Sequence, residues 1–188
     1  MSEEEKKAKK PKKEKQPVSF TRHLIRAFNV IIVVMALAVI VSYTIMPVIR
    51  VTGDTMKPTL ATGEIVLCFK TMDVETGKLC AFYRNNKILI RRVIARGGDI
   101  VNMDEDGHVI INGEQLDEPY AYGLIDITDV DIDFPYRVPD DACFVLADNR
   151  NDAADSRFTS FGNVLLEDVL GQVFFRVYPL NTISWSGL

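Results

Sequence analysis

A run of twenty consecutive uncharged residues, 27–46, sets the strongest constraint on this 188-residue chain. The run reads AFNVIIVVMALAVIVSYTIM, and its polar members are Asn29 and the three residues 42–44. A helix rises about 1.5 Å per residue, so twenty residues span about 30 Å, the thickness of the hydrocarbon core of a bilayer. The sequence therefore predicts one transmembrane helix over 27–46, which Pro47 ends.

The charges on either side of this run indicate its orientation. Residues 1–26 carry seven Lys, two Arg and four Glu, whereas the rest carries 13 Lys and Arg against 22 Asp and Glu. Because basic flanks stay in the cytoplasm, we expect 1–26 to be a cytoplasmic tail and 47–188 an extracytoplasmic domain. A cleavable signal peptide is the alternative, since residues 36–38 (ALA) match a cleavage motif. The motif lies inside the apolar run, which favours a retained, single-pass plasma membrane anchor.

Composition argues against two classes of function. The basic tail has no aromatic residues interleaved with its lysines and the remainder is acidic, so no nucleic-acid partner is expected. The cysteines Cys68, Cys80 and Cys143 form no C-x-x-C pair, and the histidines are only His23 and His108, so neither a metal nor another cofactor is expected. Outside the cell a disulfide such as Cys68–Cys80 can form; three buried thiols are the alternative.

Beyond Pro47 the pattern changes to short β-prone segments separated by turns. The predicted strands are 48–51, 64–70, 79–83, 87–95, 100–103, 108–111, 143–146 and 173–178. Hairpin turns are indicated at 104–107 (DEDG) and at Asn112-Gly113. Short strands with frequent glycine turns are typical of a mainly β domain, either a barrel or a sandwich-like sheet. Residues 117–141 are expected to form an excursion that lies on the sheet.

Four ordered segments resemble the exterior signature boxes of the type I signal peptidases. They are 53–60 (GDTMKPTL), 77–82 (GKLCAF), 90–99 (IRRVIARGGD) and 147–157 (ADNRNDAADSR). The family patterns are Gly-Asp-Ser-Met-x-Pro-Thr-Leu, Gly-Asp-Ile-Val, Lys-Arg-x-x-Gly-x-Pro-Gly-Asp and Gly-Asp-Asn-Arg-x-x-Ser-x-Asp-Ser-Arg. With the anchor, these segments identify the chain as a member of that family, Gram-positive-like in kind.

The resemblance implies a fold and a reaction. The implied fold is an antiparallel β-barrel or sheet domain preceded by one N-terminal transmembrane helix. Enzymes of the family release exported preproteins by cutting after a small-x-small motif at the membrane surface. A serine attacks the scissile carbonyl, and a lysine kept neutral by an apolar site takes its proton. The nucleophile's amide and a residue two positions earlier stabilise the oxyanion; Thr55 and Gly53 hold these positions here.

The catalytic positions depart from the family pattern. Thr55 replaces the serine nucleophile, and its β-methyl restricts the hydroxyl. Arg91 replaces the lysine base, and a guanidinium stays protonated and cannot accept a proton. Ala153 replaces the serine that orients the lysine. General-base assistance is typically worth about 10²–10⁴-fold, so the family reaction is not expected here.

Two further groups of residues follow from the resemblance. Residues expected to line a peptide-binding pocket beside the nucleophile position are Val51, Thr52, Met56, Leu60, Leu89 and Ile90. Residues expected to brace the site are Asp148, Asn149, Arg150, Asp155 and Arg157, with an ion pair between the last two.

Three functions remain open at this point. The first is a non-catalytic homologue that holds an extended chain by strand addition at the outer face of the membrane. Such degenerate members resemble accessory proteins of Gram-positive pilus assembly, which implies the lipid bilayer, exported preproteins or pilin-type peptides, and a sortase as partners. The second is an active signal peptidase with Thr55 as nucleophile. The third is a membrane-anchored structural subunit that binds no peptide.

Overall fold

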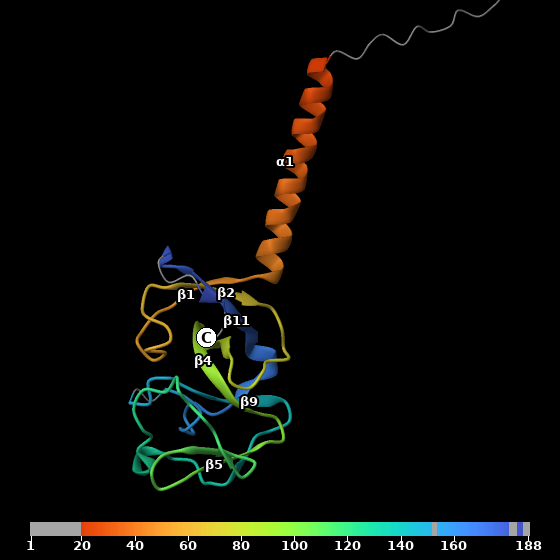
Figure 1. Cartoon of the computed structure of the whole chain (residues 1–188). Coiled ribbons are helices and arrows are strands. Elements are labelled where there is room, and N and C mark those ends of the chain that lie inside the picture. Colours follow the sequence, from red (N-terminus) through yellow and green to blue (C-terminus); the bar gives the residue numbers. More distant parts are fainter. Residues whose placement is uncertain (1–19, 152–153, 181–183, 186–188) are drawn as a thin grey trace, which may run out of the picture. The chain divides into compact units, whose positions relative to one another are not determined.

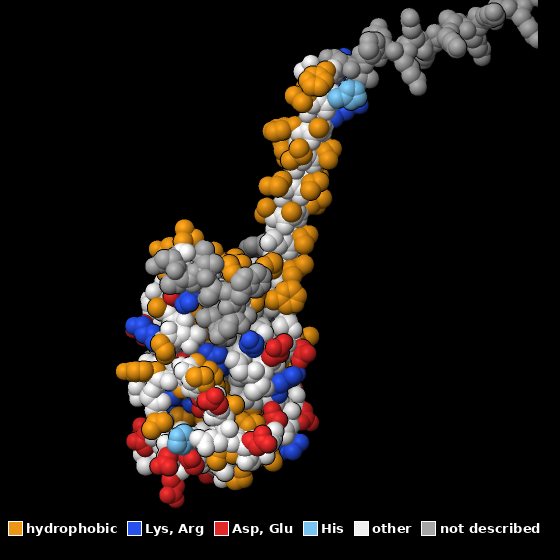
Figure 2. Space-filling model, viewed as in Figure 1, with side chains coloured by type: hydrophobic (Ala, Val, Ile, Leu, Met, Phe, Trp, Pro, Cys, Tyr) orange, Lys and Arg blue, Asp and Glu red, His pale blue; other side chains and the backbone are white. Residues whose placement is uncertain are grey.

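The computed structural model describes residues 20–151, 154–180 and 184–185. The apolar run forms α1, Phe20–Ile45, which contains neither Gly nor Pro and is followed by Pro47 (Figure 1). Its segment Phe20–Ser42 is long and apolar enough to cross a membrane, and no part of the segment's most apolar stretch is buried in the protein. Figure 2 shows hydrophobic side chains along the visible face of this helix.

The helix begins earlier than the sequence predicted. Residues 20–26, assigned to the basic tail, are helical, and the rest of that tail, 1–19, lies outside the described residues. Arg22 and Arg26 therefore stand on the first turns of α1 rather than before it. The chain divides into two compact units, one up to Ile40 and one from Val41 onward.

The second unit is built on a large antiparallel sheet. Its strands follow the order β1-β2-β11-β3-β4-β9-β10, with β12 also pairing β11. Their bounds are β1 (Val48–Arg50), β2 (Ile65–Phe69), β3 (Leu79–Arg84), β4 (Lys87–Arg96), β9 (Ala142–Leu146), β10 (Val164–Leu165), β11 (Val169–Tyr178) and β12 (Ser184–Trp185). The sheet confirms a mainly antiparallel β fold.

A smaller antiparallel sheet completes the unit, in the order β7-β6-β5-β8. Its strands are β5 (Ile100–Met103), β6 (Val109–Ile111), β7 (Glu114–Gln115) and β8 (Tyr136–Arg137); two 3₁₀ turns, η1 (Ile127–Asp129) and η2 (Leu166–Asp168), lie in the connections. Figure 1 shows β4 leading from the region of β1 and β2 toward the small sheet. Acidic side chains gather over the small sheet on the visible face in Figure 2.

The eight predicted strands are all present, with ends shifted by a few residues. The two-residue strands β7, β8, β10 and β12 were not predicted, because so short a segment carries no periodic pattern. The predicted excursion 117–141 contributes to the core, since Ile125 and Val138 are buried with β5 and β9.

Strand β4 positions the site because both of its faces are covered. Six consecutive residues, Ile90–Ala95, are buried. Successive side chains of a strand point to opposite faces, so Arg91 and Arg92 enter different environments. The paired arginines of the sequence therefore serve two separate clusters, described below.

The three cysteines are buried free thiols, so the structure contains no disulfide among them. Burial raises the pKa of Cys68 to about 12. A hydrogen bond with Cys143, together with burial, raises the pKa of Cys80 well above its ordinary value. Such thiols behave as small apolar residues of the core.

Candidate functional site

The side chains of Arg91 and Thr55, which the sequence predicts to hold the family's base and nucleophile positions, are in direct contact. Arg91 Nη1 donates to Thr55 Oγ1 at 2.9 Å and to the carbonyl of Ile90 at 2.7 Å, while its Nε donates to the carbonyl of Ala154 at 2.8 Å. Arg91 as a whole is only 4% exposed, and its guanidinium carbon lies 6.0 Å from the centre of the Phe161 ring. The hydroxyl oxygen of Thr55 is thus a hydrogen-bond acceptor for a cation.

This contact does not activate the Thr55 hydroxyl as a nucleophile. A general base must accept the proton of the attacking hydroxyl, and a guanidinium has only donors. The donation from Arg91 also engages a lone pair of Thr55 Oγ1, the atom that would attack a carbonyl. The pair can hold an oxygen atom in place, but it cannot remove a proton from it.

A tight loop between β1 and β2 presents Thr55. Gly53 adopts a φ of 82°, a left-handed conformation that favours glycine, and its carbonyl accepts from the Thr62 hydroxyl at 2.7 Å. The Thr62 hydroxyl and Lys57 hold the pKa of Asp54 below its usual value. Gly53 therefore lies on a turn fixed by this hydrogen bond, and its part in an oxyanion site with Thr55 stays a prediction.

A small cavity of about 90 Å³ opens beside Thr55 and Arg91. About 10–15 Å³ of such space holds one water, so this cavity is of a size to take a small side chain. Five of the six residues predicted for the pocket line it, namely Val51, Thr52, Met56, Leu89 and Ile90. The sixth, Leu60, is fully buried in the core cluster that includes Met56 and is not on the cavity wall.

Sequence reasoning missed three residues of the cavity wall. They are Ile49, Arg50 and Ile88, which precede the motif segments on β1 and β4. The sequence feature that could have indicated these residues is their position, because each lies on a predicted strand that leads into a motif segment. The cavity is thus lined from β1 and the following loop on one side and from β4 on the other.

The two strands beside the cavity have unpaired edges. β1 ends the large sheet, with β2 as its partner. β4 pairs with β9 only from Arg92 onward, so among the described residues its first half, 87–91, has β3 as its ladder partner. Exposed backbone N–H and C=O groups on such edges can hydrogen-bond an added extended strand.

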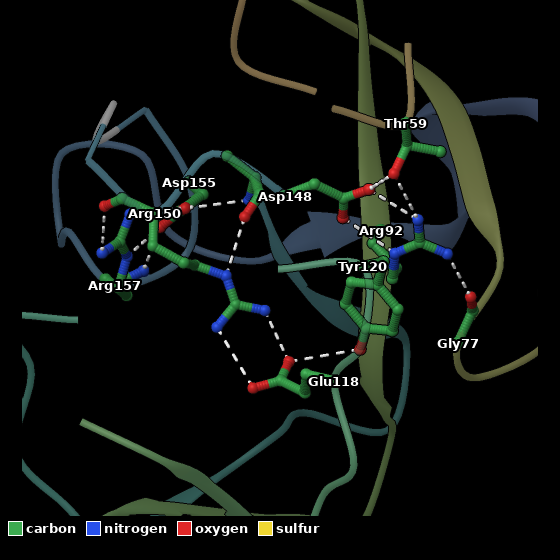
Figure 3. Close-up of polar contacts among 10 residues, drawn as sticks. Thr59, Gly77, Arg92, Glu118, Tyr120, Asp148, Arg150, Asp155 and Arg157 are labelled. Atoms are coloured by element: carbon green, nitrogen blue, oxygen red, sulfur yellow. Dashed lines mark hydrogen bonds and ion pairs between the residues drawn. The ribbon is translucent and has the colours of Figure 1, made fainter. Parts of the chain in front are cut away.

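Arg92 forms the second cluster, on the other face of β4 (Figure 3). Its Nε and Nη2 donate to the two carboxylate oxygens of Asp148 at 2.8 and 2.5 Å, and its Nη1 donates to the Gly77 carbonyl at 2.7 Å. The Thr59 hydroxyl donates to Asp148 Oδ2 at 2.5 Å. The guanidinium carbon also lies 3.8 Å from the centre of the Tyr120 ring. One bidentate ion pair therefore joins all four motif segments.

Two more buried arginines extend this bracing. Arg157 pairs with Asp155 through contacts of 2.8 and 2.9 Å, and Arg150 pairs with Glu118 through contacts of 2.5 and 3.3 Å. The Asp155 carboxylate also accepts from the amide of Ala147 at 3.0 Å. Burial, followed by the charge of Glu118, raises the pKa of Tyr120. These contacts fix the segment that carries Asp148.

Asn149 links the bracing segment directly to the Thr55 loop. Its backbone amide donates to the Thr55 carbonyl at 2.9 Å, and its side-chain oxygen is buried without a hydrogen-bond partner among the described residues. Ala153, the position of the family's orienting serine, lies outside the described residues.

The carboxylates of Asp104 and Asp106 and the ring of His108 lie within 4.8 Å of one another and are of the types that hold metals. However, Asp104 already accepts from the amides of Asp106 and His108 and contacts the His108 ring at 3.0 Å. Those bonds lower the pKa of Asp104, the first of them being that from the His108 amide. The cluster stabilises the β5–β6 turn, away from Thr55.

Comparisons with known proteins show the family to which the chain belongs. The family model for "Signal peptidase, peptidase S26" matches residues 24–178. Signal peptidase I of Bacillus amyloliquefaciens is 30% identical, with 92% of this chain and 97% of the relative covered. Signal peptidase IB of Staphylococcus aureus (strain Mu50) is 31% identical, with 81% and 85% covered. The crystal structure of a signal peptidase I from Enterococcus faecalis V583 aligns with a TM-score of 0.42 and 28% identity, covering 53% of this chain and 96% of that one.

The match over residues 24–178 gives the class of protein, a homologue of the signal peptidases. This chain belongs to the signal peptidase family, peptidase S26, with homologues in Bacillus and Staphylococcus. Proteins of this family act on exported preproteins at a membrane, and the single apolar helix is consistent with membrane anchoring here.

The ion pair between Arg92 and Asp148 yields a stability prediction. Arg92→Met leaves the fully buried Asp148 carboxylate without its cation, so we expect a loss of about 3–5 kcal/mol in the free energy of unfolding. The matched control is Arg96→Met on the same strand, because Arg96 is 49% exposed and pairs with the exposed Asp73. That control should cost at most about 1 kcal/mol.

Denaturant unfolding of the full chain in detergent measures both variants. Equal losses for Arg92→Met and Arg96→Met would show that the buried pair is not a principal brace. Arg92→Met combined with Asp148→Leu should recover much of the loss, since no buried charge then remains unpaired.

Proposed function

We propose that this chain is a membrane-anchored, non-catalytic signal peptidase homologue that binds an extended peptide. The observation that carries the proposal is the 2.9 Å donation from the Arg91 guanidinium to Thr55 Oγ1. A permanently charged donor thus contacts the hydroxyl oxygen at the proposed nucleophile position, while the bracing ion pairs around it are present. Loss of the base together with preservation of the framework favours binding over hydrolysis.

Peptide binding is supported by the walls of the cavity. An extended chain laid between β1 and the first half of β4 would gain backbone hydrogen bonds from both edges. Its alternate side chains would point into a cavity large enough only for small residues. This matches the small-x-small segments that the family recognises.

A location and a set of clients go with this proposal. The basic residues of 1–26 favour a cytoplasmic N-terminus, which places the β-rich unit outside the plasma membrane. The clients would be exported preproteins or pilin-type peptides, with a sortase as a further partner. Support for the pilus role comes from the degenerate catalytic positions, Thr55 and Arg91, through their resemblance to pilus-assembly accessory proteins.

An active peptidase that uses Thr55 is the second candidate function. It is favoured by relatives that are named signal peptidase I and cover most of the chain. It requires a proton acceptor beside Thr55. Lys57, the lysine of the same loop, instead contacts the Asp54 carboxylate at 3.1 Å, which favours the non-catalytic alternative.

The proposed orientation predicts a protease-protection pattern. Protease added outside cells whose wall has been removed should digest the β-rich unit and spare a tag placed at the N-terminus. A cytoplasmic protein in the same cells, intact throughout, is the control for lysis. A protected β-rich unit in intact cells and a digested tag would reverse the proposed topology.

The proposed peptide site predicts a selective effect of charge in the cavity. Ile88→Asp should weaken binding of an extended small-x-small peptide by about tenfold or more, because it places a charge on an apolar wall. The matched control is Ile100→Asp, on the small sheet, since Ile88 and Ile100 are 37% and 43% exposed. Calorimetry on the full chain in detergent gives the affinities. Binding by neither the wild type nor the control, or equal binding by both variants, would contradict the proposal.

A further inference from the structure

Residues 97–136 form a strongly acidic part of the chain. They contain eleven Asp and Glu and neither Lys nor Arg, and Figure 2 shows acidic side chains gathered over the small sheet that lies in this part. Two large apolar residues of the same part, Tyr122 and Leu124, are 60% and 65% exposed. Exposed aromatic and apolar side chains within polar surroundings are typical of surfaces that bind another chain.

The backbone of Tyr122 is fixed close to the Thr55 loop. Its amide donates to the Asp148 carbonyl at 2.7 Å, and its carbonyl accepts from the Arg150 amide at 2.9 Å. Tyr122 is thereby paired with Asn149 in a parallel bridge. The Asn149 amide donates in turn to the Thr55 carbonyl at 2.9 Å. Because paired strands lie about 4.8 Å apart, the Tyr122 backbone is two such spacings, about 10 Å, from that of Thr55.

A hollow of about 270 Å³ lies next to Leu124. Leu124 and Phe158 are its apolar lining, and Asp126 and Asp129 are its acidic residues. Hydrogen bonds from the hydroxyl and the amide of Thr128 lower the pKa of Asp126, which is therefore ionised at neutral pH. Apolar walls beside carboxylates suit a Lys or Arg side chain, because its apolar stem and its charged head can each find a matching surface.

The two arginines that also line the hollow do not cancel its negative charge. Arg150 and Arg157 are held in buried ion pairs with Glu118 and Asp155. Within the described part of the chain, neither carboxylate of the hollow takes part in an ion pair. The hollow, counted with the two ion pairs at its wall, therefore has a net charge of two negative.

We propose that Tyr122 and Leu124 bind the part of the peptide that leaves the cavity past Thr55, and that this part is basic. The proposal rests on the proposed peptide-binding function and specifies a second region of the same ligand. From Thr55, three extended residues at about 3.3 Å each reach Tyr122. The residues that follow would place a Lys or Arg head beside Asp126 and Asp129.

The test titrates capped small-x-small peptides into the full chain in detergent. Two of them carry the extension Leu-Lys-Lys-Leu, one at the N-terminal end and one at the C-terminal end, and two carry Leu-Glu-Glu-Leu in the same places. At one end only, the basic extension should tighten binding at least about tenfold over the unextended peptide, and the acidic extension should not. Because salt screens exposed charges, this gain should shrink as the ionic strength rises from about 0.05 M to about 0.5 M.

Aromatic variants assign the gain to the proposed surface. Tyr122→Ser should remove most of it, because the ring supplies the largest apolar contact. The matched control is Tyr178→Ser at the end of β11, since Tyr178 is 51% exposed, and this variant should keep the gain.

Charge variants assign the preference for a basic extension. Asp126→Asn combined with Asp129→Asn should abolish it, while the Asn side chain still offers an oxygen to cap η1. Glu105→Gln combined with Asp106→Asn removes the same charge from exposed positions of the β5–β6 turn and should leave the preference unchanged.

Each outcome bears on a different claim. No gain at either end, or an equal gain at both ends, overturns this proposal and leaves the proposed peptide site standing. Binding by none of the peptides overturns both. A gain that persists unchanged in Tyr122→Ser and in the Asp126–Asp129 double variant places recognition elsewhere and overturns the proposal. Equal losses in the two charge variants would show a general attraction to acidic protein, which also overturns it.

Discussion

The buried ion pair between Arg92 and Asp148 is the interaction on which the site depends. It joins β4 to the segment after β9, and through Thr59 and Gly77 it reaches the other two motif segments (Figure 3). Removing two charges from water is costly, and only good geometry with satisfied donors offsets that cost. Here both carboxylate oxygens and three guanidinium nitrogens have partners. The pair consequently fixes where the Thr55 loop lies, whatever chemistry the loop performs.

Because side chains alternate along β4, the residue that braces the fold and the residue that contacts Thr55 lie on opposite faces of the strand. Arg92 faces the bracing cluster, whereas Arg91, one residue earlier, faces Thr55 and the cavity. Replacement of a lysine by arginine at position 91 can therefore remove a proton acceptor without disturbing the bracing network. The same replacement leaves a guanidinium beside Thr55, in a cavity most of whose other lining residues are apolar.

Much of this arrangement could be predicted from the sequence, because the motif segments encode it. The anchor helix, the eight longer strands and the likeness to signal peptidases required only periodicity and ordered motifs. The full set of residues that line the cavity could not be predicted, because Arg50 and Ile88 lie outside the motif segments. They come together only where β1 and β4 converge in the fold. Leu60 was assigned to the pocket by its neighbours in sequence, yet the turn that follows Met56 directs it into the core. Partners such as Tyr120 and Glu118 lie in a segment without periodicity, so no local pattern could pair them with Arg92 and Arg150.

The most direct test of the non-catalytic account is cleavage of an exported preprotein by the purified full chain in detergent, beside an active member of the family. The account predicts product from the active enzyme and none above the buffer blank from this chain, because Arg91 cannot accept the proton of Thr55. Robust cleavage that disappears in Thr55→Ala would contradict it, since it would show that another group serves Thr55 as base.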